Sequence, residues 1–279
     1  VKYDASQAEF NRLMELVTTN ETSFFRNEPQ LLSFSEEVLP LILKEKMASS
    51  GSKTLRVWSA GCSTGEEPYT LAMLILDRLI TLNGWQIEII ANDISEETLR
   101  RARSAEYSGP TLRNVKPEIL TRYFTKNGDV YQVKPEVRSL VKFSYMNLND
   151  PRRTSAVLNM DVIFCRNVMI YFSDEAKKEL VRRYYNALRP GGYFYIGHSE
   201  TLHGVSKAFR LVYFKNALVY QKEAVGTGTG SSPIVSAGIE VASSSGREPV
   251  GTDGKNRAVE LLKHIKPVGV GEKTGRNAG

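Results

Sequence analysis

One stretch of the chain combines glycines and carboxylates in an order that suits ligand binding: residues 55–69, LRVWSAGCSTGEEPY. An apolar run enters a turn of small residues that holds Gly61 and Gly65, and a helical pattern follows. A strand, a glycine turn and a helix bring the backbone close to a nucleotide-like ligand, because glycine leaves room for that approach. Glu66 and Glu67 stand where a phosphate binder keeps its backbone amides free of negative charge. The turn therefore favours a ligand with hydroxyl groups or positive charge over a pyrophosphate.

Polar residues also follow the other apolar runs that predict strands. Asp93 ends one of them, where its carboxylate could accept both hydroxyls of a ribose, although an aspartate there can equally be a helix cap or a turn residue. Further strand ends carry Asn147 with Leu148 and Cys165 with Arg166. Ligands of doubly wound sheets bind beyond such strand ends. The chain lacks a strict Gly-x-Gly-x-x-Gly run, which disfavours NAD, and an adenosine ligand without a pyrophosphate indicates S-adenosylmethionine.

Helical and strand patterns alternate around these positions and predict an α/β fold, a Rossmann-like and mostly parallel sheet. The predicted helices cover 10–18, about 28–47, 68–82, 95–105 and 174–188, the predicted strands 55–59, 87–91, 161–164 and 193–196, and a closing antiparallel hairpin 209–213 and 217–221. Residues 106–142 interrupt the alternation, with a helix over 119–124, a turn at Asn127 and Gly128, and strands over 130–133 and 137–143. We interpret this interruption as a small inserted helix and hairpin.

The composition is that of an ordinary globular protein, with 41% hydrophobic and 24% charged residues. No apolar run approaches the roughly 20 residues of a membrane span, so no membrane insertion is expected. The chain has only 2 cysteines, which argues against a disulfide framework and indicates the cytoplasm. The net charge of +6 is scattered, and the one basic cluster, Arg100, Arg101 and Arg103, is followed by Glu106. Nucleic acid is therefore not the expected partner.

Four stretches in register resemble the CheR-type chemotaxis receptor methyltransferases, which methylate glutamate side chains of methyl-accepting chemotaxis proteins. The stretches are 18–26 (TTNETSFFR), 58–69 (WSAGCSTGEEPY), 164–172 (FCRNVMIYF) and 197–200 (GHSE). The resemblance covers residues 10–222. It implies a Rossmann-like methyltransferase sheet, S-adenosylmethionine as the methyl donor with S-adenosylhomocysteine as product, no metal, and the cytoplasmic domains of chemotaxis receptors as partners.

The resemblance also implies roles for individual residues. Arg26 and Tyr171 match positions that orient the reacting groups, and they are the predicted catalytic residues. The predicted cofactor-binding residues are Asn20, Thr22, Arg26, Gly61, Glu67, Asp93, Asn147, Leu148, Cys165 and Arg166.

The chemistry of methyl transfer agrees with these roles. A glutamate acceptor with a pKa near ~4.3 is already ionised at neutral pH, so no general base is required. The chain has only 3 histidines and no pattern that predicts a Ser-His-Asp triad. Arg26 could hold a carboxylate in a two-pronged contact or merely pair with Glu28, while Tyr171 could fix the acceptor's direction. Cys165 is interpreted as a small buried residue near the cofactor rather than as a nucleophile. The enzyme must then supply alignment and the exclusion of water.

Two departures from the family are visible. Members usually carry an N-terminal helical domain, of which residues 1–19 are interpreted as a remnant or linker. The turn at 125–129 is shorter than the loop with which some members grip a receptor tether, so use of a tether is in doubt. The expected parts are residues 1–19, a methyltransferase domain over 20–223 with a small β subdomain over about 119–143, and a disordered tail over 224–279, which holds 11 glycines and no Phe, Trp or Tyr.

Two other functions stay open at this point. The same fold can methylate RNA or another acceptor, because fold does not determine substrate. A non-catalytic protein that binds S-adenosylmethionine and acts as a regulator is the second alternative. The set of Asn20, Thr22, Arg26 and Tyr171 argues against the regulator, because a sensor need not keep a group that orients an acceptor.

Overall fold

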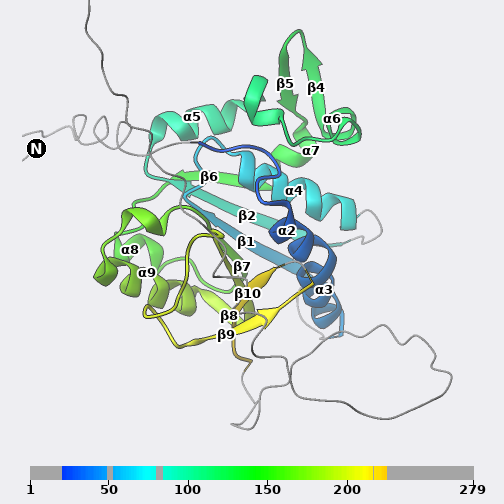
Figure 1. Ribbon diagram of the computed structural model, residues 1–279. Helices are drawn as coiled ribbons and strands as arrows, with labels where there is room; N and C mark the ends of the chain where they lie inside the picture. The colour runs from blue at the N-terminus through cyan, green and yellow to red at the C-terminus, as the bar shows by residue number, and fades with distance from the viewer. Residues whose placement is uncertain (1–20, 49–52, 80–83, 216, 225–279) are drawn as a thin grey trace, which may run out of the picture. The chain divides into compact units, whose positions relative to one another are not determined.

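The computed structural model describes residues 21–48, 53–79, 84–215 and 217–224 (Figure 1). The chain divides into two compact units, Val1–Ser236 and Ala237–Gly279, and every described residue belongs to the first. The helix predicted over 10–18, Asn20 and all but one residue of the predicted tail over 224–279 lie outside the described residues.

A seven-stranded sheet in the order β6-β2-β1-β7-β8-β10-β9 forms the centre of this unit. Its strands are β1 (Thr54–Ala60), β2 (Gln86–Asp93), β6 (Val141–Tyr145), β7 (Met160–Cys165), β8 (Leu188–Ile196), β9 (Phe209–Tyr213) and β10 (Leu218–Lys222). The first five run parallel, and β9 and β10 form an antiparallel hairpin on β8. The order reverses between β1 and β7, which is where ligands bind in such sheets. The predicted mostly parallel sheet with a closing hairpin is confirmed.

The central strands are apolar because both faces of the sheet are covered. All six residues of β7 are buried, as expected for a parallel strand between two helical layers. Successive side chains of β7 pack into different hydrophobic clusters on the two faces of the sheet: Phe164 belongs to one cluster and Cys165 to the other.

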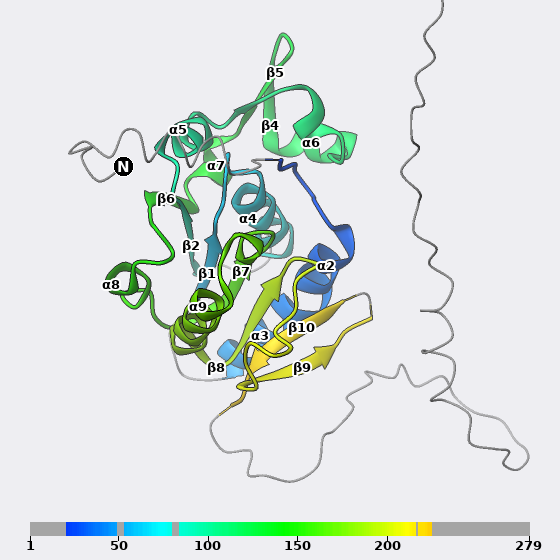
Figure 2. The same cartoon turned by 60° about the vertical axis from the view of Figure 1, so that its left-hand side comes forward.

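Helices of both layers pack on these two clusters. On one face lie α2 (Glu28–Leu32), a π-helical turn (Ser33–Val38), α3 (Leu39–Ala48), α4 (Glu66–Leu79) and α5 (Glu96–Ser104), and on the other α8 (Pro151–Thr154) and α9 (Asp174–Ala187). Figure 2 shows α2 and α4 on the side of the sheet away from α8 and α9. None of the described helices is both long and apolar enough to cross a membrane.

Capping residues explain where two of these helices begin. The Ser95 side chain accepts a hydrogen bond from the Thr98 backbone N–H, and Ser173 accepts one from Ala176. Both serines therefore act as N-caps, as their position before acidic first turns predicts.

The inserted element contains a small three-stranded sheet in the order β3-β5-β4. Its elements are β3 (Glu106–Tyr107), a 3₁₀ turn (Gly109–Leu112), α6 (Pro117–Tyr123), β4 (Phe124–Asn127) and β5 (Val130–Val133), followed by α7 (Pro135–Arg138). The predicted hairpin is present, but its turn residues are Gly128 and Asp129, because Asn127 ends β4 and pairs with Val130 of β5. The strand predicted over 137–143 is wrong in its first half, because Pro135 starts a helical turn there. Its second half belongs to β6 of the large sheet, where Phe143 pairs with Ala91 of β2.

Candidate functional site

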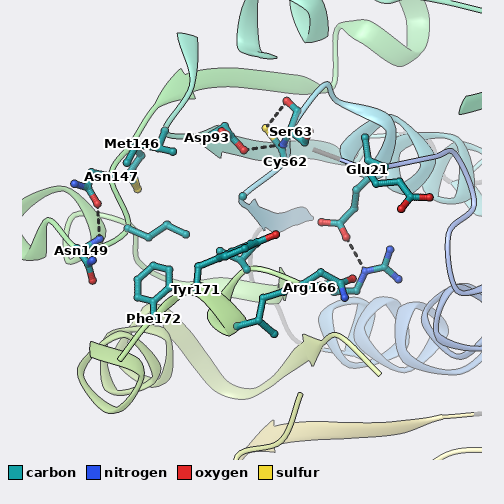
Figure 3. A pocket seen from close by; sticks show the side chains of 18 of the residues that line it. Glu21, Cys62, Ser63, Asp93, Met146, Asn147, Asn149, Arg166, Tyr171 and Phe172 are labelled. Carbon is teal, nitrogen blue, oxygen red and sulfur yellow. Dashed lines mark hydrogen bonds and ion pairs between the residues drawn. The ribbon is translucent and has the colours of Figure 1, made fainter. Parts of the chain in front are cut away.

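A cavity of about 460 Å³ lies beyond the carboxyl ends of β1, β2, β6 and β7 (Figure 3). Its volume falls in the range of small-molecule sites. The predicted site residues that line it are Thr22, Arg26, Gly61, Glu67, Asp93, Asn147, Leu148, Arg166 and Tyr171. Residues from segments more than a hundred positions apart therefore meet in one pocket at the topological switch between β1 and β7.

Cys165 lies apart from this set. Its side chain is fully buried, and its sulfur accepts a hydrogen bond from the Tyr184 hydroxyl at 3.3 Å, on the α9 side of the sheet. Burial raises the pKa of both Cys165 and Cys62, so neither thiol is a nucleophile near neutral pH. The interpretation of Cys165 as a small buried residue agrees with this placement.

Glu67 and Arg166 form an ion pair in the wall of the pocket. Arg166 Nε donates to Glu67 Oε2 at 2.7 Å, and the two side chains are 5% and 13% exposed. Ser59 Oγ donates to the other carboxylate oxygen at 2.7 Å. Arg166 Nη1 also donates to the Arg26 backbone carbonyl at 2.9 Å. One guanidinium thus joins the end of β7, the start of α4 and the loop before α2.

That loop presents the Arg26 side chain to the pocket. Phe25 (φ 54°) and Asn27 (φ 63°) flank Arg26 in the left-handed region, which a phenylalanine rarely adopts. Phe24 anchors the loop, because it is fully buried and its ring packs edge-on against Tyr107, with centroids 4.8 Å apart. Arg26 Nη1 donates to the Glu21 carbonyl at 2.6 Å.

The alternative pairing of Arg26 with Glu28 is not seen. Among the residues that the structure describes, Glu28 pairs at 3.8 Å with Lys116. The charge of Arg26 therefore has no described carboxylate partner and remains directed at the pocket it lines.

Asp93 organises the turn between β2 and α5 as well as lining the pocket. Its Oδ2 accepts the Ser63 N–H at 2.8 Å, and its Oδ1 accepts the Ser95 N–H at 3.0 Å. Burial raises the pKa of Asp93, and these backbone hydrogen bonds oppose the shift. Thr98 Oγ1 also donates to Oδ1, at 3.4 Å. The turn role weighed for this residue is thus present, and Asp93 lines the pocket as well.

Backbone conformation and neighbouring side chains both require glycine at two positions of the turn. Gly61 (φ 82°) and Gly65 (φ 93°) have left-handed backbones that favour glycine. A Cβ on Gly61 would lie 2.4 Å from a methyl group of Val168, and one on Gly65 would lie 2.9 Å from the Tyr107 hydroxyl. Protein side chains therefore lie where a Cβ of either glycine would be, and Gly61 also lines the cavity.

The two neighbouring glutamates also separate in the structure. Glu66 is 1% exposed and is not among the residues that line the cavity, whereas Glu67 lines it. Thr64 Oγ1 donates to Glu66 Oε2 at 2.7 Å, and burial raises the pKa of Glu66 against the effect of this bond. Only Glu67 lines the cavity and can contact a ligand there directly. The expectation that both glutamates determine which ligand binds is therefore wrong for Glu66.

The raised pKa of Glu66 leads to a pH-dependent stability difference. The Glu66 carboxyl binds its proton more tightly in the native protein than in the unfolded chain, so the ionised form of Glu66 opposes folding. This destabilisation disappears as the pH falls towards 4.5, the ordinary pKa of a glutamate, because Glu66 is then protonated in the native protein. We expect the free energy of unfolding of Glu66→Gln, relative to wild type, to increase from pH 4 to pH 8. Urea unfolding across this range measures it, and a difference that does not change with pH would contradict it.

Tyr171 stands at the mouth of the pocket on a 3₁₀ turn (Met169–Tyr171). It is 47% exposed, and its hydroxyl makes no hydrogen bond to a described residue. Figure 3 shows its side chain extending between Phe172 and Arg166 into the pocket. An exposed phenol at this place can donate a hydrogen bond to an incoming acceptor.

The remaining wall is apolar on one side. Ile94, Met146 and Leu148 line the pocket beyond β2 and β6. Arg183 of α9, 4% exposed, holds this part by donating from Nη2 to the Leu148 carbonyl at 2.9 Å. A wall that combines apolar side chains with two carboxylates suits a ligand with a flat ring, hydroxyl groups and positive charge. Within the described part of the chain, no group of three His, Cys, Asp or Glu side chains is placed to hold a metal ion.

Sequence reasoning missed several residues of the pocket. They are Glu21, Cys62, Ser63, Ile94, Met146, Asn149, Asn167, Val168, Ile170 and Phe172. Glu21 adjoins Thr22, and the others lie in the loops after β1, β2, β6 and β7, so position after a strand was the available signal for all but Glu21. Nothing in the residue types separated those that face the pocket from those that do not.

Comparisons with known proteins agree with this geometry. Residues 20–218 match the family described as "CheR methyltransferase, SAM binding domain". The chain is 36% identical over 223 residues to "Chemotaxis protein methyltransferase 2" of Vibrio cholerae, covering 80% of this chain and 76% of that protein. It is 37% identical over 215 residues to "Chemotaxis protein methyltransferase 1" of Pseudomonas aeruginosa, covering 75% and 76%. Among solved structures, the rRNA methyltransferase aviRa from Streptomyces viridochromogenes aligns over 74% of this chain and 87% of its own, with a TM-score of 0.43 and 16% identity, a likeness too distant to bear on function.

Proposed function

The chain belongs to the CheR methyltransferase family, and from this premise we propose that it transfers the methyl group of S-adenosylmethionine to glutamate carboxylates in the cytoplasmic domains of chemoreceptors. It is an S-adenosylmethionine-dependent methyltransferase of the chemotaxis type, as its relatives are named. We assign the activity to residues 20–223 and a cytoplasmic location to the protein, since the proposed acceptors lie there.

The pocket at the β1–β7 switch is the observation that carries the proposal. Glu67 and Asp93 offer carboxylate oxygens to the pocket, and Met146 and Leu148 offer apolar surface. Ribose hydroxyls and a cationic methionine portion are complementary to the carboxylates, and adenine is complementary to the apolar wall. We therefore propose that Thr22, Glu67, Asp93, Asn147, Leu148 and Arg166 hold the cofactor, which supplies an electrophilic methyl group when bound.

Arg26 and Tyr171 are the groups that we propose act on the acceptor. Arg26 keeps its guanidinium at the pocket without a described carboxylate partner, so it can hold an incoming carboxylate through two N–H groups. Tyr171 can donate a hydrogen bond from its hydroxyl to the same carboxylate and set its direction. Since the acceptor is already ionised, the protein needs to move no proton, and its contribution is alignment in a site that excludes water.

The stability of the product to alkali tests this function. The protein is incubated with methyl-labelled S-adenosylmethionine and a chemoreceptor cytoplasmic fragment, and the product is treated with mild alkali. We expect the label to leave as volatile methanol, because a carboxyl methyl ester is hydrolysed by base. A reaction without the protein and one with a receptor fragment whose target glutamates are glutamines serve as controls.

Two results would contradict the proposed acceptor. Label that survives alkali would indicate transfer to another atom of the fragment, such as a nitrogen. Cofactor binding without transfer to any acceptor would indicate a regulator that binds S-adenosylmethionine.

A further inference from the structure

The Glu200 carboxylate joins the loops that follow two neighbouring strands of the sheet. Its Oε2 accepts the backbone N–H of Asn167, after β7, at 2.9 Å. The same oxygen accepts the N–H of Gly197, after β8, at 2.7 Å. The Glu200 N–H in turn donates to the Gly197 carbonyl at 2.9 Å, which closes a tight turn around the carboxylate.

The two loops are built around this contact. A Cβ on Gly197 would lie 2.6 Å from Glu200 Oε2 and 3.0 Å from the Asn167 nitrogen, so no larger residue fits without displacing the carboxylate. Asn167 has a left-handed backbone (φ 59°), which turns the chain directly after the N–H that Glu200 accepts. Asparagine tolerates this conformation better than most residues.

The contact reaches the pocket through Val168. Asn167 and Val168 both line the cavity, and Val168 fills the space beside Gly61 that a Cβ would occupy. Glu200 itself is not one of the lining residues. A chain of contacts therefore links the loops after β8, β7 and β1: Glu200 accepts the Asn167 N–H, and Val168, the next residue, packs on the glycine turn.

We propose that Glu200 is a positioning residue of the methyl-transfer site, which holds the Asn167–Val168 wall in the geometry that binds S-adenosylmethionine. The inference rests on the proposed function, because it takes the pocket to be the cofactor site. The turn around Glu200 serves the pocket from outside, and the exposed His198 and Ser199 between Gly197 and Glu200 only complete the turn.

The energetics of Glu200 favour a role in positioning over one in stability. Its second oxygen, Oε1, is buried and has no hydrogen-bond partner among the described residues. A buried carboxylate oxygen without a partner opposes folding. A glutamine side-chain oxygen has two lone pairs, so it could accept the same two backbone N–H groups that Glu200 Oε2 accepts. The acceptor atom, rather than the charge, is thus the feature that the two loops require.

Affinity for S-adenosylhomocysteine, measured by titration calorimetry on the full chain, tests the inference without any acceptor. We expect Glu200→Ala to weaken binding by at least about tenfold, since small displacements of a binding wall are costly. Glu200→Gln should stay within about threefold of wild type, because its amide oxygen can accept both N–H groups. Gly197→Ala, which keeps the carboxylate but displaces it, should weaken binding as Glu200→Ala does. The exposed Glu175→Ala serves as the control variant.

Each outcome decides the question. Wild-type affinity in Glu200→Ala and Gly197→Ala would overturn the inference, and so would an affinity of Glu200→Gln as low as that of Glu200→Ala. If Glu200→Ala does not fold, the pair of Gly197→Ala and Glu200→Gln gives the same comparison. A wild-type protein that does not bind S-adenosylhomocysteine would remove the proposed cofactor site and this inference together, whereas the other results concern Glu200 alone.

Discussion

Arg26→Ala is expected to lower the rate of receptor methylation by a factor of about 10², because losing the group that aligns the acceptor carboxylate misplaces the reacting atoms. The guanidinium lines the pocket, and its one described hydrogen bond is to the Glu21 carbonyl. Little of its interaction energy is therefore used in the fold. We expect the free energy of unfolding to change by no more than about 1 kcal/mol, as for substitutions away from the core.

Steady-state kinetics with a receptor fragment, together with urea unfolding, measure both quantities. Arg113→Ala is a matched control, because Arg113 is 55% exposed, contacts the same loop through Glu21 at 3.7 Å, and is not among the pocket-lining residues. It should leave the rate within about twofold of wild type. An unchanged rate in Arg26→Ala, or a loss matched by Arg113→Ala, would remove Arg26 from the proposed mechanism.

Calorimetry on the same variant separates two carboxylates that Arg26 could hold. If it holds the acceptor glutamate, the affinity for S-adenosylhomocysteine stays near that of wild type. If it holds the carboxylate of the cofactor's methionine portion, that affinity falls with the rate.

The large sheet could be predicted from the sequence because its signals are local. The run from Met160 to Cys165 is apolar throughout, as a strand buried on both faces must be. Ser95 and Ser173 precede acidic first turns and cap helices in the structure. Such features depend on residues within a few positions of one another, so one sequence is sufficient to recognise them.

The role of 137–143 could not be predicted, because it depends on which strand is the neighbour. Val141 and Phe143 fit a small hairpin as well as the edge of the large sheet by their alternation alone. Only pairing with β2, which is distant in sequence, distinguishes the two. The same applies to Gly61 and Gly65, whose left-handed turns were visible as glycines but whose close neighbours, Val168 and Tyr107, were not.

The candidate site could be recognised from the sequence as a set of strand ends. Which of two adjacent residues faces the pocket could not be predicted. Glu66 and Glu67 are adjacent and chemically identical, yet the helix that starts at Glu66 buries the first and turns the second to the pocket. Cys165 and Arg166 separate in the same way, because successive residues at a strand end face opposite sides of the sheet. Glu200 carries no sequence signal of its partners, since both are backbone N–H groups.

Arg166→Ala is expected to destabilise the protein by about 3–5 kcal/mol, the usual result of removing one partner from a buried ion pair. The variant leaves the Glu67 carboxylate, 13% exposed, with only Ser59 as a described partner. It also removes the donor to the Arg26 carbonyl, which ties the loop before α2 to the pocket. Arg166→Lys should restore little, because an ammonium group cannot reproduce the fork that reaches Glu67 and that carbonyl together.

Burial, rather than the presence of an Arg–Glu pair, is the cause of this expected loss, and Arg182 provides the comparison. Arg182 makes a two-pronged contact with Glu179, at 3.0 and 2.8 Å, but the two side chains are 63% and 46% exposed. Solvent screens such a pair, so Arg182→Ala should change stability very little. Urea unfolding of both variants measures the contrast. Equal losses would show that the Glu67–Arg166 pair is screened like a surface pair, and would contradict its proposed place in a closed wall of the cofactor pocket.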